Sequence, residues 1–373
     1  MEKWDQQVEE QEAQQFAGVN RGRLLAELSR ILPAASLLHQ EEDLRPYECD
    51  GLTAYRRLPL AVALPDSEEQ VAAILRACNA QGVPVVARGS GTSLSGGALP
   101  HRFGLVLSLA KLKKIIKVDP VARTAVVQPG VRNLAISEAA APFGLYYAPD
   151  PSSQIACSIG GNVAENAGGV HCLKYGLTVH NVLRVRAVTL DGEILELGSE
   201  ALDAPGFDLL ALMIGSEGLL AVATEITVRL TPKPLLAQCV LAAFDDVRKA
   251  GEAVAEVIAA GIIPAGLEMM DRAATAAVEP FVKAGYPLDA EAILLCESDG
   301  TPEEVAEEVA RMRQVLERSG ATQIRVSRDE AERLRFWSGR KAAFPAAGRI
   351  SPDYYCMDGT IPRRRLGDML EAI

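Results

Sequence analysis

Glycine, serine and threonine crowd one short stretch of the chain, "ARGSGTSLSGGALP" at residues 87–100. Closely spaced glycines let backbone N–H groups approach an anion without a Cβ in the way, and the hydroxyl groups add uncharged donors. The stretch is therefore expected to be either a cradle for a phosphate-like anion or a flexible surface loop. Taken alone, its composition does not decide between the two.

Two nucleotide-binding templates fail on this stretch. The G-x-G-x-x-G fingerprint would need a glycine where Leu94 stands, and the P-loop would need a lysine where Gly97 stands. Both templates also require a helix directly after the loop, whereas "RFGLVLSL" is typical of a strand. The sequence therefore supports neither a standard NAD site nor a standard ATP site.

Two further stretches of the same kind follow, "APDPSSQIACSIGGNVAENAGGVHCLKYG" at residues 148–176 and "MIGSEGLLAVATEI" at residues 213–226. Separate glycine-, serine- and asparagine-rich loops in one domain indicate one extended ligand held at more than one place. A dinucleotide with a central pyrophosphate fits this description.

The elements that must position these loops form two patterns. A strand–helix–strand unit over residues 58–87 leads directly into the first loop, and a series of strands follows, with Asp191-Gly192 as a hairpin turn between two of them. Beyond Pro232 and Pro234 the order becomes strand, helix, strand, strand, helix, strand, which is typical of a ferredoxin-like α+β sandwich. We therefore expect an α+β protein with a helical segment over 1–55, a ligand-binding domain over 56–232 and a second domain over 233–373.

Composition narrows the class of protein. The 373 residues carry a net charge of −11 without a long basic block, which makes nucleic acid an unlikely partner. The seven cysteines are scattered and form no C-x-x-C pair, so neither a disulfide framework nor a metal site is expected. The acidic N-terminus is no signal peptide and no apolar run reaches membrane-span length. We expect a cytoplasmic protein, with peripheral association to the inner face of the membrane through partners left open.

The three motifs together resemble the FAD-binding (PCMH-type) domain of the vanillyl-alcohol-oxidase-like flavoproteins. Within that family the chain is most similar to the D-type subunits of bacterial glycolate oxidases (glycolate dehydrogenases), with D-lactate and D-2-hydroxyglutarate dehydrogenases as close relatives. The resemblance implies a two-subdomain FAD-binding domain followed by a ferredoxin-like cap domain. It also implies that FAD is the cofactor. The cofactor is expected to be non-covalent, because Thr92 stands where many relatives carry the histidine that attaches FAD.

The same resemblance assigns roles to individual residues. It places the pyrophosphate on the first loop, the flavin along the second, and the adenine end against the backbone of Val222. The residues that it assigns to FAD are Arg88, Gly89, Ser90, Gly91, Thr92, Ser93, Gly97, Asp150, Pro151, Ser153, Gly160, Gly161, Asn162, Asn166, Gly168, Gly218 and Val222.

Oxidation of a 2-hydroxy acid needs a hydride acceptor, a cation for the carboxylate and a base for the hydroxyl proton. The resemblance gives the cation as Arg340, which follows Trp337, although a surface arginine is the alternative. It places the base in a histidine-rich segment downstream of residue 373. Among the four histidines of the chain, His171 beside the second loop could act near the flavin, but a structural histidine is the favoured interpretation.

We therefore expect oxidation of glycolate to glyoxylate, with D-lactate or D-2-hydroxyglutarate as alternative substrates. A flavin-binding assembly subunit without activity of its own is a further alternative. The chain ends inside an expected helix, at "LGDMLEAI", so we expect its cap to be incomplete and residues 1–373 alone not to turn over substrate. The resemblance also implies two protein partners, a second flavin-domain subunit and an iron–sulfur subunit.

Overall fold

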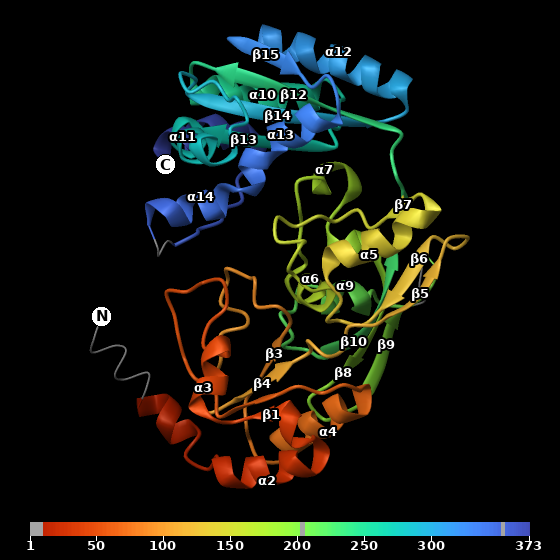
Figure 1. Cartoon of the computed structure of the whole chain (residues 1–373), viewed down its shortest axis with the longest axis vertical. Helices are drawn as coiled ribbons and strands as arrows, with labels where there is room; N and C mark the ends of the chain where they lie inside the picture. The colour runs from red at the N-terminus through yellow and green to blue at the C-terminus, as the bar shows by residue number, and fades with distance from the viewer. Residues whose placement is uncertain (1–9, 202–205, 352–354) are drawn as a thin grey trace. The chain divides into compact units, whose positions relative to one another are not determined.

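The computed structural model describes residues 10–201, 206–351 and 355–373. The chain divides into two compact units, and each unit is assembled from separate stretches of sequence (Figure 1). Unit 1 comprises Met1–Tyr147, Ser153–Ala167 and Leu177–Thr231. Unit 2 comprises Ala148–Ser152, Gly168–Gly176 and Pro232–Ile373.

The first sheet of unit 1 carries the first glycine-rich loop. Its strands have the order β1-β2-β4-β3, with β2 and β3 both parallel to β4. Helix α4 connects β2 to β3 and begins at Ser67, whose Oγ accepts a hydrogen bond from the N–H of Gln70 at 3.3 Å. The elements are β1 (Leu37–Leu38), β2 (Ala61–Ala63), α4 (Glu68–Asn79), β3 (Val85–Arg88) and β4 (Leu105–Ser108).

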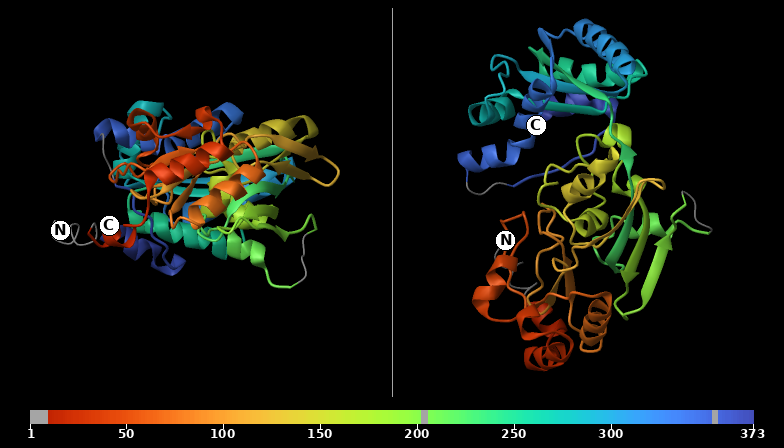
Figure 2. Two further views of the ribbon diagram at one scale, coloured as in Figure 1. Left: turned by 90° about the horizontal axis from the view of Figure 1, so that it is seen from below. Right: turned by 45° about the vertical axis from the view of Figure 1, so that its right-hand side comes forward.

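Helix α2 (Arg21–Ile31) belongs to the core of this subdomain. Its apolar side chains Leu24 and Leu28 are fully buried in the cluster that also contains Val71 and Ile74 of α4. Figure 2 shows α2 in red beside α4 in orange. Most of the described part of residues 1–55 thus packs within unit 1 and does not form a separate body.

The second sheet of unit 1 is antiparallel throughout, in the order β5-β6-β10-β8-β9. The predicted hairpin at Asp191-Gly192 is present, and Gly192 has φ of +76° as the turn requires. Short helices accompany the sheet, and their apolar side chains share a core with it. The elements are β5 (Ile115–Asp119), β6 (Thr124–Val127), α5 (Asn133–Ala140), β7 (Leu145–Tyr146), α6 (Ile159–Glu165), α8 (Thr178–Asn181), β8 (Val182–Val188), β9 (Ile194–Gly198), α9 (Leu209–Met213) and β10 (Val222–Arg229).

Unit 2 contains a four-stranded antiparallel sheet in the order β13-β14-β12-β15. With α10 after β12 and α12 after β14, this order is that of a ferredoxin-like fold, so the α+β prediction is confirmed for this part of the chain. The elements are β12 (Leu236–Phe244), α10 (Val247–Ala259), β13 (Gly266–Asp271), β14 (Ala292–Gly300), α12 (Pro302–Arg318) and β15 (Gln323–Val326).

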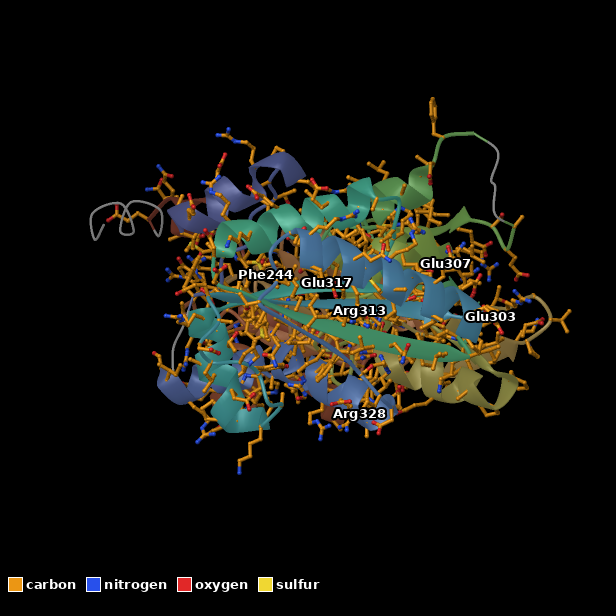
Figure 3. The ribbon with its side chains drawn as sticks, turned by 90° about the horizontal axis from the view of Figure 1, so that it is seen from above. Phe244, Glu303, Glu307, Arg313, Glu317 and Arg328 are labelled. Carbon is orange, nitrogen blue, oxygen red and sulfur yellow. The ribbon has the colours of Figure 1, made fainter. Side chains whose placement is uncertain are left out.

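Both faces of this sheet are covered, because the side chains of β12 alternate between two cores. Val240 and Ala242 pack with α10 and α12, whereas Cys239 and Leu241 pack on the opposite face. The outer side of α12 is charged, with Glu303, Glu307, Arg313 and Glu317 exposed (Figure 3).

The second face of the sheet is covered by helices that the sequence analysis did not identify. Helix α11 contains Pro280 near its end, which obscures the helical pattern, and it begins at Asp271, whose side chain caps Ala274. Helix α13 begins at Asp329 and carries both Trp337 and Arg340. The additional helices are α7 (Cys172–Tyr175), α11 (Arg272–Val282), α13 (Glu330–Lys341) and α14 (Ala343–Ile350). Helix α15 (Leu366–Ala372) lies where a helix was expected at "LGDMLEAI", and it packs against α10. In the described parts of the chain, no helix has the length and apolar character needed to cross a bilayer.

Candidate functional site

The first glycine-rich stretch forms an irregular, mostly half-buried loop between β3 and β4. The backbone N–H groups of residues 89–94 donate no hydrogen bond to any residue that the structure describes. Gly91 and Gly96 have φ of +66° and +81°, in the left-handed region that glycine adopts without strain. A run of adjacent N–H groups left free by the protein suits a phosphate group.

Arg88 supports this loop from inside. Its buried Nη1 donates to the carbonyl oxygens of Cys49 and Ala98, at 2.8 and 3.2 Å. A Cβ at Gly91 would lie 2.3 Å from the guanidinium, so the loop passes directly over it. The sequence predicts that Arg88 contacts the cofactor, whereas in the structure it shapes the loop that would do so.

Residues 49–52 hold the loop in place as well. The N–H of Gly51 donates to the carbonyl of Ser93 at 2.9 Å, and the buried carboxylate of Asp50 accepts from the N–H of Leu52 at 2.9 Å. A Cβ at Gly51 would lie 2.8 Å from the Ser93 oxygen. Sequence analysis missed this support, because nothing in "ECDGL" indicates a contact with a segment forty residues away.

The middle of the second glycine-rich stretch forms helix α6 (Ile159–Glu165), where the sequence analysis expected only loop. Ser158 caps helix α6, and Gly160 and Gly161 lie in its first turn. A Cβ at Gly160 would lie 2.5 Å from the Cβ of Pro129, so this glycine is required by packing. A Cβ at Gly161 would meet only the Oγ of Ser158, at 3.4 Å, so the space in front of Gly161 is not filled by protein.

Within unit 1 the structure brings the first and third motifs together with the middle of the second, residues 153–167. A Cβ at Gly89 would lie 2.2 Å from the Oγ of Ser158, which places the first loop against the start of α6. The N–H of Gly215 donates to the carbonyl of Val163 at 2.9 Å, which joins the third motif to α6. A Cβ at Gly218 would lie 3.4 Å from that of Ala87, at the end of β3.

Other residues predicted to bind the cofactor serve the protein as well. The Nδ2 of buried Asn162 donates to Asn133 at 2.8 Å, and the Oδ1 of Asn166 accepts from the N–H of Val179 at 3.0 Å. The carbonyl of Ser153 accepts from the N–H of Cys157 at 2.8 Å. Val222 is the first residue of β10 and is paired with Val188 of β8. On the opposite edge of β10, strand β6 pairs only with residues 226–229, so it does not reach Val222.

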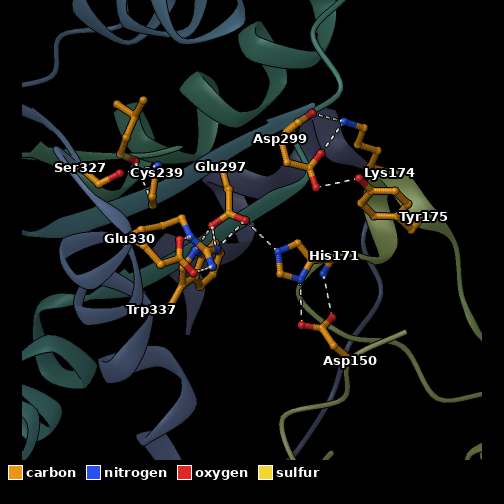
Figure 4. Close-up of polar contacts among 12 residues, drawn as sticks. Asp150, His171, Lys174, Tyr175, Cys239, Glu297, Asp299, Ser327, Glu330 and Trp337 are labelled. Carbon is orange, nitrogen blue, oxygen red and sulfur yellow. Dashed lines mark hydrogen bonds and ion pairs between the residues drawn. The ribbon is translucent and has the colours of Figure 1, made fainter. Parts of the chain in front are cut away.

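Asp150, Pro151 and Gly168 lie in unit 2, with the rest of 148–152 and 168–176. There Asp150 takes part in a polar cluster centred on His171, which is partly buried (Figure 4). The Nδ1 of His171 lies 2.8 Å from Asp150 Oδ2, and its Nε2 lies 3.0 Å from Glu297 Oε1. Glu297 is 1% exposed and also accepts two hydrogen bonds from Arg333, at 2.9 and 2.8 Å, and one from Trp337 Nε1.

The two carboxylates keep His171 charged. Burial opposes the charge, but the hydrogen bonds to Asp150 and Glu297 outweigh it and raise the pKa of His171 to about 10. Burial likewise opposes ionisation of Glu297, but hydrogen bonds from His171 and Arg333 hold its pKa below the usual range. His171 is therefore an imidazolium at neutral pH, with both nitrogens engaged.

A second contact of the same kind lies two residues further along β14. Asp299, 5% exposed, accepts a hydrogen bond from the hydroxyl of Tyr175 at 2.7 Å and forms an ion pair with Lys174. Glu297 and Asp299 lie on one face of the strand, since side chains alternate along it. Together they bind the segment 171–175 to the sheet of unit 2 (Figure 4).

Arg340 lies on α13 and is fixed at one of its nitrogens. Its Nε donates to Glu268 Oε2 on β13 at 2.7 Å, and its side chain is 30% exposed. Neither of its terminal nitrogens donates to a described residue. A guanidinium that is fixed in place can bind a carboxylate through two parallel N–H groups.

Sequence analysis missed Glu297, Asp299 and Arg333. One signal was available, because "AILLCESDG" places two acids at alternate positions of an otherwise apolar strand, and buried acids are paired. Over the described residues, no group of three or more His, Cys, Asp or Glu side chains is arranged to hold a metal ion.

A domain of two subdomains with glycine-rich loops, followed by a ferredoxin-like unit, is the architecture of a class of flavin-dependent oxidoreductases. Family models agree with this assignment: residues 59–198 match an FAD binding domain, and residues 233–373 match the FAD linked oxidases, C-terminal domain. The chain belongs to the FAD-linked oxidase family, and the PCMH-type fold prediction is confirmed.

Curated relatives place the chain more narrowly within the family. It is 63% identical over 355 residues to the glycolate oxidase subunit GlcD of Escherichia coli (strain K12), covering 95% of this chain and 71% of that protein. Identity to the GlcD of Bacillus subtilis (strain 168) is 38%, covering 88% of this chain and 70% of that protein. A D-lactate dehydrogenase of Anaerostipes hadrus is 30% identical, with coverage of 93% and 74%.

Solved structures confirm the fold. An alkyldihydroxyacetonephosphate synthase aligns with a TM-score of 0.76 at 18% identity, covering 94% of this chain and 73% of that one. A p-cresol methylhydroxylase aligns with a TM-score of 0.72 at 18% identity, with coverage of 86% and 70%.

Proposed function

We propose that this protein is the flavin-bearing subunit of a glycolate-oxidising enzyme, which converts glycolate to glyoxylate. The observation that carries the choice of substrate is the 63% identity to the E. coli glycolate oxidase subunit, well above the 30% identity to the D-lactate dehydrogenase. The reaction removes a hydride from Cα and a proton from the hydroxyl group. FAD, when bound, supplies the two-electron acceptor.

The residues of unit 1 fit this cofactor. The free N–H groups of residues 89–94 would hold the pyrophosphate, and the open space at Gly161 would admit another part of the same molecule. Arg88 and residues 49–52 would hold the loop in the binding shape. Gly97, Gly218 and Val222 would complete the cradle, and Asp150, Pro151, Ser153 and Gly168 would line the flavin, as the family resemblance suggests.

Within unit 2, we assign the substrate carboxylate to Arg340. A guanidinium forms two parallel hydrogen bonds with a carboxylate, and neither terminal nitrogen of Arg340 donates to a residue in the described part of the chain. His171 does not fit the role of base, because it is already protonated at neutral pH and donates to two carboxylates. The favoured interpretation of His171 as a structural residue is thus supported by its surroundings.

The proposal is tested by anaerobic mixing of the native holoenzyme with glycolate, D-lactate or D-2-hydroxyglutarate while the oxidised flavin band is followed. We expect glycolate to bleach the band with the highest kcat/KM. Faster bleaching by either of the other acids would reassign the substrate, and no bleaching by any of them would favour a subunit that binds FAD without performing the chemistry.

Replacing Arg340 by lysine is expected to weaken substrate binding without affecting FAD. Lysine keeps the charge but cannot form the bidentate pair, so the loss of binding should be about 1.5–3 kcal/mol. Calorimetric titration with oxalate, a two-carbon anion with no C–H bond to oxidise, measures this loss directly. Unchanged oxalate affinity in R340K would remove Arg340 from the site.

The cofactor is expected to be held without a covalent bond. Thr92 occupies the position of the attachment histidine in many relatives, and its hydroxyl offers no comparable nucleophile. Acid precipitation of the purified protein should release all of the flavin into the supernatant. Yellow colour that remains in the washed pellet would show a covalent link.

We also propose two protein partners, a second flavin-domain subunit and an iron–sulfur subunit that accepts the electrons. The support for a multi-subunit enzyme is that the two GlcD relatives are named as subunits of a glycolate oxidase. For the domain limits we propose an FAD-binding domain over 56–232 and a substrate domain over 233–373.

A further inference from the structure

Glu297 stands out because it is a buried carboxylate that binds two separate segments of unit 2. Arg333 and Trp337 of α13 donate hydrogen bonds to it. His171 of the segment 168–176 forms a further hydrogen bond with it. A single carboxylate thus contacts the helix that carries Arg340 and the segment next to Asp150. Both Arg340 and Asp150 belong to the candidate site.

The spacing on α13 shows how Glu297 acts on Arg340. Arg333, Trp337 and Arg340 stand at positions i, i+4 and i+7, so they share one face of the helix. Glu297 binds the first two of these residues and thereby fixes the rotation of the helix about its axis. That rotation decides where the third side chain projects, and Glu268 on the neighbouring strand β13 then holds its Nε at 2.7 Å.

The opposite end of the network is fixed equally firmly. His171 is the bridge between Glu297 and Asp150, and the N–H of His171 also donates to Asp150 Oδ1 at 3.3 Å. A Cβ at Gly169 would lie 2.6 Å from backbone atoms of Asp150, so the two parts of the segment touch without a gap. The position of Asp150 therefore depends on His171, and that of His171 on Glu297.

We propose that Glu297 is a positioning residue that sets Arg340 and the Asp150–His171 pair in one fixed arrangement, so that the carboxylate-binding arginine is held in register with the flavin-side segment. This inference rests on the proposed role of Arg340. It assigns to Glu297 an effect on ligand affinity through α13, in addition to its contribution to the stability of unit 2.

A double-mutant cycle tests the proposal, with oxalate binding to the FAD-loaded protein as the readout. E297Q removes the charge but keeps the size of the side chain, and it is expected to weaken oxalate binding about 10-fold, as a displaced binding group would. Because Glu297 acts through Arg340, the E297Q/R340K double variant should bind oxalate no more weakly than R340K alone, which is marked non-additivity.

A matched control is Glu308 of α12, which contacts the opposite face of β14. Glu308 accepts a hydrogen bond from Ser298 at 2.6 Å, so E308Q removes a comparable carboxylate contact to β14 without touching α13. Urea unfolding of each variant separates loss of stability from loss of affinity. We expect E308Q to leave oxalate affinity unchanged, whatever its effect on stability.

The outcomes distinguish the two proposals. If R340K weakens binding but E297Q does not, or if their effects add, Glu297 serves the fold alone and the inference is overturned. If R340K itself leaves oxalate binding unchanged, the role proposed for Arg340 is wrong and this inference falls with it.

Discussion

Replacing Gly161 by valine is expected to abolish FAD binding while leaving unit 1 folded. The backbone of Gly161 is helical with negative φ, so valine meets no backbone strain there. A Cβ at this position contacts only the Oγ of Ser158, at an ordinary 3.4 Å, so the protein itself tolerates the side chain. The branched side chain would instead fill the space that the cradle leaves for its ligand. Titration of the apoprotein with FAD, followed by flavin fluorescence, measures the loss.

The neighbouring glycine provides a control with the opposite signature. A Cβ at Gly160 would lie 2.5 Å from that of Pro129, so G160A should lower the melting temperature of unit 1. G161V should keep the wild-type circular dichroism and melting profile of the apoprotein. FAD occupancy of G161V equal to that of the wild type would show that this part of the second motif is not a cradle.

The stability of unit 2 is expected to fall as the pH rises above neutrality, because of His171. Its pKa is about 10 in the folded protein, against an ordinary value of 6.5. A group whose pKa is raised by folding stabilises the fold fully below its unfolded pKa, and this contribution is lost as the pH rises towards the folded value. The free energy of unfolding should therefore fall by about 1.4 kcal/mol per pH unit, or about 2 kcal/mol between pH 7 and 8.5. Urea unfolding followed by the fluorescence of buried Trp337, in a W4F background, measures the slope.

The upper limit of pH 8.5 keeps the contribution of the cysteines small. Burial raises the pKa of Cys78 and Cys296 to about 12, so above their ordinary value of 9.0 their ionisation in the unfolded chain adds a slope of its own. H171Q cannot bind the extra proton, so its stability should fall much less steeply than that of the wild type across the same window, with only the cysteine contribution left. A wild-type slope equal to that of H171Q would mean that His171 is neutral in the folded protein.

Local patterns were enough to predict much of the fold. The strand–helix–strand pattern over residues 58–87 and the Asp191-Gly192 turn each depend on neighbouring residues, and each appears where expected. The ferredoxin-like order of unit 2 followed from the alternation of strand and helix. The glycine-rich loops were recognised because their composition itself is the signal, and unit 1 brings the first and third motifs together with residues 153–167 of the second.

The remaining parts of the site depend on contacts between residues far apart in sequence. Nothing near Gly51 indicates that it lies against Ser93, and nothing near His171 indicates that its partner is Glu297, 126 residues later. The family resemblance assigns Arg88 to the cofactor, but it did not indicate that Nη1 of Arg88 donates to the carbonyl groups of Cys49 and Ala98. Helix α11 was hidden by Pro280. Such contacts are chosen by the tertiary fold, so short-range patterns cannot reveal them.

The interleaving of the two units limits how this protein can change by recombination. Residues 148–152 and 168–176 lie inside the sequence that matches the FAD binding domain, yet they belong to the unit built by the C-terminal domain. A chimera joined at Pro232 would pair the His171 segment of one parent with the β14 acids of another. Unless both parents carried matching charges, a buried carboxylate such as Glu297 would lose its partners. Exchange of unit 2 between flavoproteins of this family therefore requires two short pieces of the upstream sequence to be inherited with it, because unit 2 is encoded by three separated stretches of the gene.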